Sequence, residues 1–364
     1  ILRNLYGVDI MVEATEIAKL RLFLKMVAVV DVNPFDDNLG LDPLPDIDFN
    51  IRCGNTLVGY ATEKDLMNDL NYGDIFAKQE FKEKVTMEMD VVSSAYDTFR
   101  KVQLEQDEDL ETFKKAKKEL KKRLEKLNEL LNRKLHTATA QSMDYDEWKK
   151  SHQPFHWIAE YYDIINGNGG FDVIIGNPPY VEYSKIRNDY KVHNYETINS
   201  GNLYSYVIER SLAIMKNGNY IGMIIPISAF CTARMESLMK LLLTKTNCSY
   251  ISNYAERPSK LFEGAERNLS IFISQIQNNK ANSIIRTTYY YKWKAEHRNI
   301  LFQRISYFDV GEVATTRNFP KISCLPELNI LKELQSIKRN IGYYSVRNSG
   351  NTLYYKNRDR KSVV

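Results

Sequence analysis

A short apolar strand runs directly into the sequence Asn-Pro-Pro-Tyr at residues 177–180. Residues 171–175 are mostly apolar and rich in Val and Ile, which predicts a buried strand. The two prolines that follow remove two backbone donors and stiffen the loop. The sequence therefore predicts a strand whose exit is a rigid loop that presents hydrogen-bond acceptors.

Strand-like and helix-like segments alternate on both sides of this loop. Apolar runs predict strands, and helical spacing of apolar residues predicts helices. The predicted strands are 5–10, 49–55 and 220–225, and the predicted helices are 12–30, 203–215 and 234–243. The alternation predicts an α/β fold with an open, largely parallel sheet. The near-continuous apolar stretches 173–175 and 223–225 are expected to be covered on both faces.

A long helical segment interrupts this alternation from about residue 65 to residue 165. Between Phe113 and Leu131, apolar residues recur at three- and four-residue spacing, which predicts a coiled-coil-like seam. The stretch 111–134 holds eight Lys and two Arg against four Glu, a net charge of +6. The solvated face of a packed helical hairpin explains these charges better than contact with DNA phosphates does.

Composition excludes several classes of protein. Lys and Arg number 50 against 46 Asp and Glu, so attraction to a polyanion must come from local clusters of charge. The longest apolar run, 221–230, is about half the roughly 20 residues of a membrane span, and no signal peptide is visible. His152, His156 and His193 lack metal-ligand spacing, so we expect structural roles and no metal site. The scattered cysteines, Cys53, Cys231, Cys248 and Cys324, favour a reducing cytoplasm.

The Asn-Pro-Pro-Tyr loop has the groups needed to methylate an exocyclic amine such as that of adenine. This amine is a poor nucleophile because its lone pair is delocalised into the ring. The Asn177 side-chain oxygen and the Pro178 carbonyl can each accept one N–H hydrogen bond and aim the lone pair at a methyl donor. Pro178 and Pro179 hold these acceptors in place before the base arrives.

A base in a duplex must leave the stack to reach such a loop. Tyr180 offers a ring on which the flipped base can stack, and Phe262 is the candidate for its opposite face. A C5-cytosine enzyme is disfavoured, because it needs a cysteine nucleophile in this loop and no cysteine follows a proline in this chain.

Two strand ends are candidates for binding a nucleoside cofactor. Asp9 ends the first predicted strand and could accept hydrogen bonds from two ribose hydroxyls, although such an Asp is more often a helix cap. Asn55 leaves the second predicted strand and could receive an adenine amino group, although Gly54-Asn55 is also good turn chemistry. Ile10 and Thr56 follow these two residues and are included in the predicted site.

Taken together, these motifs resemble a known family. The segments 5–10, 50–57 and 171–180 resemble, in that order, the methyltransferase part of bifunctional type IIG restriction–modification enzymes and their phage-defence relatives. The resemblance covers about the first 280 residues and includes 155–157 and 202–204. It implies an N-terminally truncated, Rossmann-like S-adenosylmethionine-dependent methyltransferase sheet with a long helical insertion and the start of a C-terminal recognition domain.

The resemblance also implies roles for residues. With S-adenosylmethionine as cofactor, Asp9 would contact its ribose and Asn55 its adenine. Residues 177–180 would bind the target adenine of double-stranded DNA, and Phe262 would be the second stacking aromatic. The family's glycine-rich first motif is expected to precede Leu5, and an upstream nuclease domain is expected in the full-length protein of a bacterium or archaeon.

We therefore expect four parts. They are a first part of the methyltransferase core at 1–64, a coiled-coil-like helical insertion at 65–165, a second part of the core at 166–280, and a linker with the start of a target-recognition domain at 281–364. The last part interleaves aromatic and basic residues, as in 286–304 and 338–361, which suits either DNA contact or core strands of a recognition domain.

Two alternatives remain open. The same loop could orient a side-chain amide, as in a protein glutamine-amide methyltransferase. The helical insertion and the basic, aromatic C-terminal segment favour a large polyanionic substrate instead. A chain of these residues could also be a non-catalytic DNA-binding fragment. The length of the full gene separates the two enzyme interpretations, since a compact protein favours the amide substrate.

Overall fold

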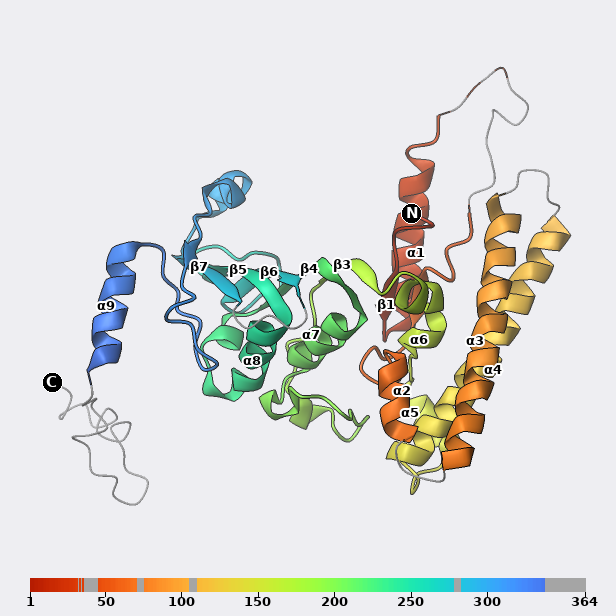
Figure 1. The fold of residues 1–364 in the computed structure, drawn as a ribbon. Helices are drawn as coiled ribbons and strands as arrows, with labels where there is room; N and C mark the ends of the chain where they lie inside the picture. Colours follow the sequence, from red (N-terminus) through yellow and green to blue (C-terminus); the bar gives the residue numbers. More distant parts are fainter. Residues whose placement is uncertain are drawn as a thin grey trace.

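A computed structural model describes residues 1–31, 33, 35, 45–70, 75–104, 110–277 and 283–337. In this part the chain is a mixed α/β protein with a two-stranded sheet, a six-stranded sheet and a helical region (Figure 1). The expected α/β class is therefore confirmed.

The smaller sheet pairs β1 (Gly7–Asp9) with β2 (Ile51–Cys53) in parallel, so that Asp9 lies opposite Cys53. Helix α1 (Val12–Val27) follows β1 directly. Tyr161 contacts the starts of both strands, since its hydroxyl lies 3.3 Å from Gly7 O and 3.0 Å from Asn50 O. The starts of β1 and β3 meet where the rings of Tyr6 and Phe171 pack edge to face, 6.0 Å apart.

The larger sheet has the strand order β3-β4-β6-β5-β7-β8. Its strands are β3 (Phe171–Gly176), β4 (Met215–Pro226), β5 (Thr246–Tyr254), β6 (Leu269–Ile276), β7 (Ile284–Tyr291) and β8 (Phe308–Asp309). Only β3/β4 and β5/β7 pair in parallel, whereas β4/β6, β5/β6 and β7/β8 are antiparallel.

The prediction of a largely parallel sheet was therefore wrong, and the sheet is mixed. The segment 255–268 between β5 and β6 contains no helix. Parallel neighbours need a crossover connection, usually helical, whereas a chain that returns through a loop pairs antiparallel. The loop connection between β5 and β6 is therefore the physical reason for their antiparallel pairing.

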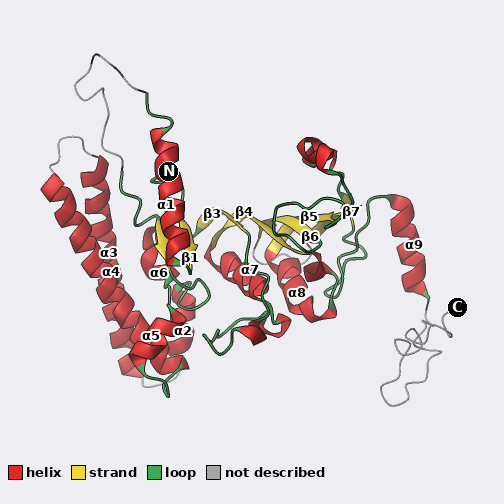
Figure 2. Ribbon diagram, turned by 180° about the vertical axis from the view of Figure 1, so that it is seen from behind, coloured by secondary structure: helices red, strands yellow, loops and turns green. Residues whose placement is uncertain are grey.

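Strand β4 lies in the centre of the core, where Ile221, Met223 and Ile225 are 0–3% exposed. Helices α7 (Leu203–Ile214) and α8 (Glu236–Lys245) cover the same face of the sheet (Figure 2). The expectation that β3 is covered on both faces was wrong, because it is the edge strand: Val173 is 60% and Ile175 80% exposed.

The helical region contains α2 (Glu63–Leu70), α3 (Ile75–Leu104), α4 (Leu110–Thr139), α5 (Tyr145–His152) and α6 (Trp157–Glu160). Helices α3 and α4 lie side by side as a hairpin (Figure 1). The predicted seam is confirmed, since Leu120, Leu124, Leu127 and Leu131 are at most 2% exposed. None of the described helices is long and apolar enough to cross a membrane.

The six-stranded sheet extends past residue 280, where the second part of the core was expected to end. Strand β7 pairs with β5, and Val310 and Phe319 belong to the same hydrophobic core as β4. The final described helix, α9 (Leu325–Ser336), lies at the far end of the molecule (Figure 1). The basic, aromatic stretch 338–361 lies outside the described residues.

Candidate functional site

The Asn-Pro-Pro-Tyr loop leaves β3 at Gly176 and turns back toward β4. Asn177 is exposed, Pro178 is buried and Pro179 is exposed. The Tyr180 hydroxyl lies 2.6 Å from Asn177 Oδ1 and 3.0 Å from Ile224 O on β4. The loop is thus closed by its own last side chain, which the sequence did not predict.

A single hydroxyl hydrogen can serve only one of these two acceptors at a time. Burial raises the pKa of Tyr180 to about 12, so the hydroxyl keeps its hydrogen at neutral pH. Asn177 Oδ1 has two lone pairs, and Tyr180 can occupy no more than one of them. Among the described residues, no donor is bonded to the Pro178 carbonyl. Asn177 and Pro178 therefore both keep an acceptor position for a ligand.

The strand directions bring four chain segments to the end of the sheet where this loop lies. The exits of β3, β4, β5 and β7 and the entrance of β6 share this end, because β6 runs opposite to its two neighbours. Two backbone bonds join them: Ile227 N donates to Asn268 O at 3.0 Å, and Ala255 N donates to Tyr291 O at 2.8 Å. We call this end of the sheet the site edge.

Phe262 belongs to the 255–268 loop at the site edge and is half-buried. Its carbonyl accepts a hydrogen bond from Ala265 N at 3.3 Å. Its ring and the ring of Tyr180, both in described residues, are not in contact. The pairing of these two aromatics around a base thus stays a prediction.

Sequence reasoning missed Arg267, which ends the same loop. Its positive charge is close enough to lower the pKa of Tyr180 in opposition to burial, and it acts on Tyr204 in the same way. Arg267 is exposed and forms no ion pair with any described residue. A single Arg after a turn carries no pattern, so only the strand order could reveal its position beside Tyr180.

Asp9 and Asn55 follow adjacent parallel strands. Asp9 is exposed, and its Oδ1 accepts a hydrogen bond from Met11 N at 2.8 Å, which stabilises the entry to α1. Its other carboxylate oxygen forms no hydrogen bond with a described residue. Ile10, next along the chain, is 38% exposed. Asp9 is therefore not a helix cap, since its bond is to Met11 N before the helix begins, and it keeps one oxygen available.

Asn55 is buried, and its Oδ1 accepts a hydrogen bond from Leu57 N at 3.1 Å. Its Nδ2 has no hydrogen-bond partner among the described residues; the Tyr190 hydroxyl is nearby but lies outside hydrogen-bonding geometry. Thr56 O accepts from Trp157 Nε1 at 3.3 Å. An unpaired buried amide is costly, so Asn55 Nδ2 is a candidate ligand contact.

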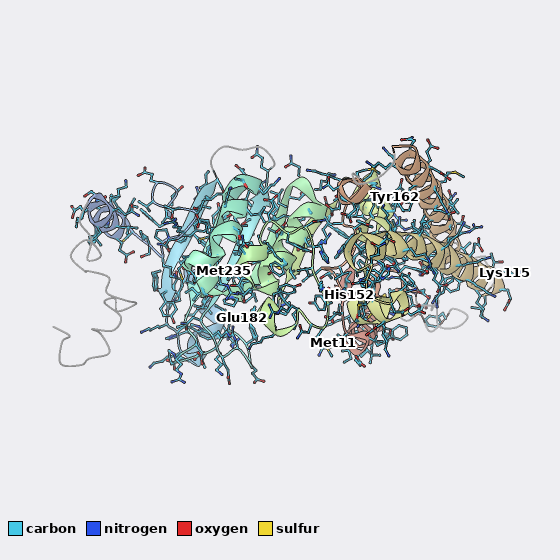
Figure 3. All side chains as sticks on the ribbon, turned by 90° about the horizontal axis from the view of Figure 1, so that it is seen from below. Met11, Lys115, His152, Tyr162, Glu182 and Met235 are labelled. Atoms are coloured by element: carbon cyan, nitrogen blue, oxygen red, sulfur yellow. The ribbon has the colours of Figure 1, made fainter. Side chains whose placement is uncertain are left out.

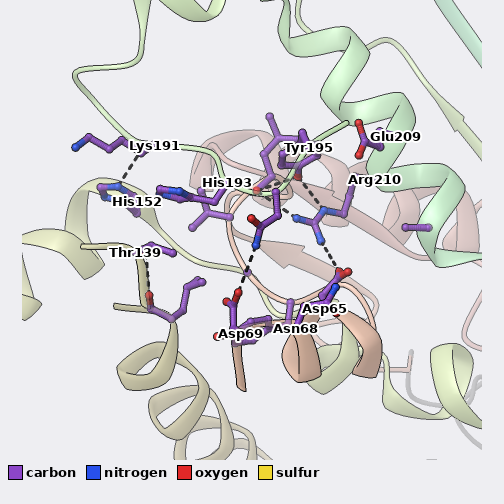
Figure 4. A pocket seen from close by; sticks show the side chains of 17 residues that line it. Asp65, Asn68, Asp69, Thr139, His152, Lys191, His193, Tyr195, Glu209 and Arg210 are labelled. Carbon is purple, nitrogen blue, oxygen red and sulfur yellow. Dashed lines mark hydrogen bonds and ion pairs between the residues drawn. The ribbon is translucent and has the colours of Figure 1, made fainter. Parts of the chain in front are cut away.

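A separate cavity of about 130 Å³ lies between α2, the end of α4 and α7 (Figure 4). Arg210 forms an ion pair with Asp65 at 3.4 Å, and it also lies 2.9 Å from the Tyr195 hydroxyl. Asn194 donates to Asp69 at 3.3 Å. This cavity is a polar contact between the helical region and the α7 side of the sheet, where Arg210, Asp65 and Asp69 are already engaged.

Two of the three histidines, His152 and His156, have structural contacts, as the sequence predicted, and His193 lines the cavity of Figure 4. His156 is fully buried, its Nδ1 accepts from Tyr60 N at 3.1 Å, and its Nε2 lies 3.0 Å from Asn132 Oδ1. Burial lowers the pKa of His156 to about 3, so the ring is neutral and Nε2 carries the hydrogen. His152 Nε2 accepts from Lys191 N at 3.1 Å, and no three-ligand metal cluster occurs in the described ranges.

Comparison with known proteins gives three kinds of match. The family described as Eco57I restriction-modification methylase matches residues 3–262. A Methanocaldococcus jannaschii protein, whose name describes a type II restriction enzyme and methyltransferase, is 29% identical over 93% of this chain and 31% of its own length. The chain therefore spans about a third of that relative.

Solved structures also show a likeness. A nuclease-deletion mutant of the type ISP restriction-modification enzyme LlaGI, in complex with a DNA substrate mimic, matches with a TM-score of 0.34 and 13% identity, over 55% of this chain and 24% of that one. The type IIG restriction endonuclease BpuSI matches with a TM-score of 0.28 and 12% identity, over 46% of this chain and 20% of that one.

Proposed function

The chain belongs to the Eco57I restriction-modification methylase family, and from this premise we propose that it transfers a methyl group from S-adenosylmethionine to the N6 amine of adenine in double-stranded DNA. The observation that carries the proposal is the Asn-Pro-Pro-Tyr loop, which keeps acceptor positions at Asn177 and Pro178 and fixes them by the hydroxyl of Tyr180.

The two acceptors match the two hydrogens of the amine. One N–H of adenine N6 donates to Asn177 Oδ1 and the other to the Pro178 carbonyl, which draws the nitrogen toward sp³ geometry. A hydrogen bond of this kind costs little reorganisation because the prolines hold the loop rigid before the base binds. The lone pair then points away from both acceptors, toward a methyl donor.

Tyr180 has two functions in this proposal. Its ring stacks on the flipped base and offsets part of the unstacking cost of a few kcal/mol. Its hydroxyl bonds Asn177 Oδ1 in the free site and can turn to Ile224 O when the amine arrives. Because burial raises the pKa of Tyr180, the hydroxyl remains a donor throughout the neutral pH range. Phe262 is assigned to the opposite face of the base.

The residues at the ends of β1 and β2 fit the proposed cofactor. Asp9 has one free carboxylate oxygen for ribose hydroxyls. Asn55 was expected to receive the adenine amino group, but its Oδ1 already accepts from Leu57 N, so we assign its unpaired buried Nδ2 to an acceptor atom of the purine ring. Ile10 and Thr56 flank these contacts. S-adenosylmethionine, when bound, supplies an electrophilic methyl group. Among the chain's own residues, Asp9 and Asn55 bind and orient, and Asn177 and Pro178 align the acceptor amine.

The fold supports an assignment as a Rossmann-like methyltransferase sheet. In open α/β sheets ligands bind beyond the carboxyl ends of parallel strands, and Asp9, Asn55 and Asn177 all follow such strands. We assign 1–64 and 166–280 to the two parts of this core and 65–165 to its helical insertion. The target-recognition part was expected to begin at 281, but β7, Val310 and Phe319 still belong to the core, so we propose that it begins after them.

We assign the whole protein to a restriction–modification or phage-defence system that acts on double-stranded DNA and carries a nuclease domain upstream of this chain. The matched relative is three times as long as this chain, and its name joins restriction and methylation in one protein. The family membership favours this assignment over a protein glutamine-amide methyltransferase and over a non-catalytic DNA-binding fragment.

The test is transfer of tritium from labelled S-adenosylmethionine to mixed-sequence duplex DNA by the intact protein. We expect label as N6-methyladenine, and its loss in an Asn177→Ala variant by at least about a hundredfold, the scale seen when one preorganised polar group is removed. Asn219→Ala is the matched control, because Asn219 bonds Asp172 at the opposite end of the β3/β4 pair.

Each rival interpretation has its own outcome. Label on a protein glutamine and none on DNA would replace adenine by an amide substrate. DNA binding without any transfer, in the presence of saturating cofactor, would identify a non-catalytic DNA-binding protein. Equal rates for Asn177→Ala and the unmodified protein would contradict the assignment of the loop.

A further inference from the structure

An open cavity lies at the site edge, three to four strands away from the Asn-Pro-Pro-Tyr loop. It is lined by Glu256, Arg257, Pro258, Lys260, Asn268, Tyr290 and Lys292. These residues come from the exit of β5, the entrance of β6 and the exit of β7, which the strand order brings together. Three cations and one carboxylate give the lining a net charge of +2.

The cations of this cavity are available for a ligand. Arg257 and Lys292 are exposed and form no ion pair with a described residue, and Lys260 has only a distant contact, 3.8 Å, with the highly exposed Glu266. By contrast, in the cavity of Figure 4 Arg210 pairs with Asp65, and Asp69 accepts from Asn194. A concave surface with unpaired cations is suited to an anion.

The cavity wall is held in a fixed shape. Asn268 Oδ1 accepts from the Tyr290 hydroxyl at 2.6 Å and from Glu256 N at 3.0 Å, which joins two strand ends. The guanidinium of Arg298 donates to Lys260 O at 2.9 Å and to Leu261 O at 3.0 Å, and packs over the Trp293 ring. The loop is therefore braced from both sides, and its cations sit on a preorganised backbone.

We propose that Arg257, Lys260 and Lys292 bind the phosphodiester backbone of the DNA on one side of the target adenine. The proposal rests on the function assigned to the Asn-Pro-Pro-Tyr loop, and it adds a second contact to the same substrate. Backbone contacts of this kind fix the position of a protein on the duplex without reading its sequence. The three residues are DNA-positioning residues, distinct from the groups that touch the reacting amine.

The spacing of the strands suits this assignment. The exits of β5 and β7 are three and four strands from the exit of β3, which corresponds to about 14–19 Å at roughly 4.8 Å per strand. Successive base pairs rise about 3.4 Å along each DNA strand. A duplex that lies along the site edge with its adenine at Asn177 therefore brings phosphates about four to six steps away to the cavity.

The experiment measures how the affinity of the intact protein for a duplex depends on salt, without cofactor. Each phosphate contact contributes about 0.9 to the slope of log affinity against log salt concentration, so the variant R257Q/K260Q/K292Q should lose about 2.7. The control K115Q/K118Q/K122Q removes the same charge from exposed α4 lysines that form no ion pair. Figure 3 shows Lys115 at the far end of the hairpin, remote from the sheet.

Three results would overturn the proposal. These are an unchanged slope in the cavity variant, an equal loss in the α4 control, and a loss seen with duplex RNA but not with duplex DNA. Lys292→Gln alone, at an exposed side chain without a hydrogen bond, should lose about 0.9 and keeps the test valid if the triple variant fails to fold. Because the experiment measures binding and not methyl transfer, the salt dependence of DNA affinity can still be determined if the proposed methyl transfer is wrong.

Discussion

The leucines of α4 and the isoleucines of β3 both mark apolar faces in the sequence but differ in burial. Leu120, Leu127 and Leu131 are completely buried against the rest of the helical region, whereas Ile175 on the edge strand is 80% exposed. Apolar spacing in a sequence thus identifies the face of a helix or strand that needs to be covered. It does not tell whether the described chain supplies the segment that covers it. In the hairpin the partner, α3, directly precedes α4 in sequence and lies alongside it.

Polar groups also differ between the helical region and the sheet. In the helical region several buried polar groups bond one another, as His156 does with Tyr60 N and Asn132. At the site edge, Asn177, Pro178, Arg257 and Lys292 keep positions that the described chain leaves open. The helical region is thus built for stability, and the site edge for ligands. The following predictions test this division from the largest expected effect to the smallest.

Acid should destabilise the helical region through His156. Burial lowers the pKa of its ring to about 3, against an ordinary 6.5. Between these pH values the unfolded chain binds a proton at this residue and the folded chain does not. Stability is then complete above pH 6.5 and falls by about 1.4 kcal/mol per pH unit below it, on the order of 4–5 kcal/mol by pH 3. Urea unfolding between pH 7 and pH 4.5 measures this slope.

Two variants isolate the contribution of His156. His156→Gln cannot take up a proton, so its stability should fall less steeply with acid, even if it starts lower. His297→Gln, at an exposed imidazole, should keep the original slope. The carboxylates of Asp48 and Glu129, whose pKa values are lowered by their lysine partners, lose their contribution only below their ordinary 3.8 and 4.5. Identical slopes for all three proteins would contradict the assignment.

Removal of a buried side chain from the α4 seam should lower the free energy of unfolding by nearly as much. Leu127→Ala leaves a cavity in a site with no exposure, and we expect a loss of about 3 kcal/mol in the free energy of unfolding. Leu110→Ala, on the same helix but 65% exposed, is the matched control and should change it by less than about 0.5 kcal/mol. Ile175→Ala should behave like the control. A large loss for Ile175→Ala in the intact protein would break the comparison, because it would mean that another segment covers β3.

These contrasts also explain what the sequence could predict. The strand 171–176, its Asn-Pro-Pro-Tyr exit and the α4 seam have local patterns, and all three were placed correctly. The antiparallel β6 and the exposure of β3 depend on which strands become neighbours, which no local pattern encodes. For the same reason the sequence did not predict that Arg267 lies near Tyr180, or that Arg257 and Lys292 line one cavity.

Removal of the Arg298 hydrogen bonds to the 255–268 loop should have a smaller, local effect. Arg298→Ala removes two hydrogen bonds to the backbone just before Phe262, and each such bond contributes about 1 kcal/mol. We expect amide exchange at Ala265, whose N–H bonds Phe262 O, to rise about tenfold while global stability changes little. Arg304→Ala, at an exposed side chain, is the control. Unchanged exchange would mean that the loop is held by Asn268 alone.

The smallest effect is expected from a single oxygen atom. Tyr180→Phe keeps the ring for stacking and removes the hydroxyl that lies between Asn177 Oδ1 and Ile224 O. The loss of one net hydrogen bond, about 0.5–1.5 kcal/mol, predicts a rate of methyl transfer lower by about two- to thirteenfold with unchanged affinity for the duplex. Single-turnover kinetics measure it, since they separate chemistry from binding. A faster variant would mean that the Tyr180 hydroxyl competes with the amine for Asn177 Oδ1. Asn177 would then be paired within the chain, as His156 is in the helical region, and would have to be released before the base binds.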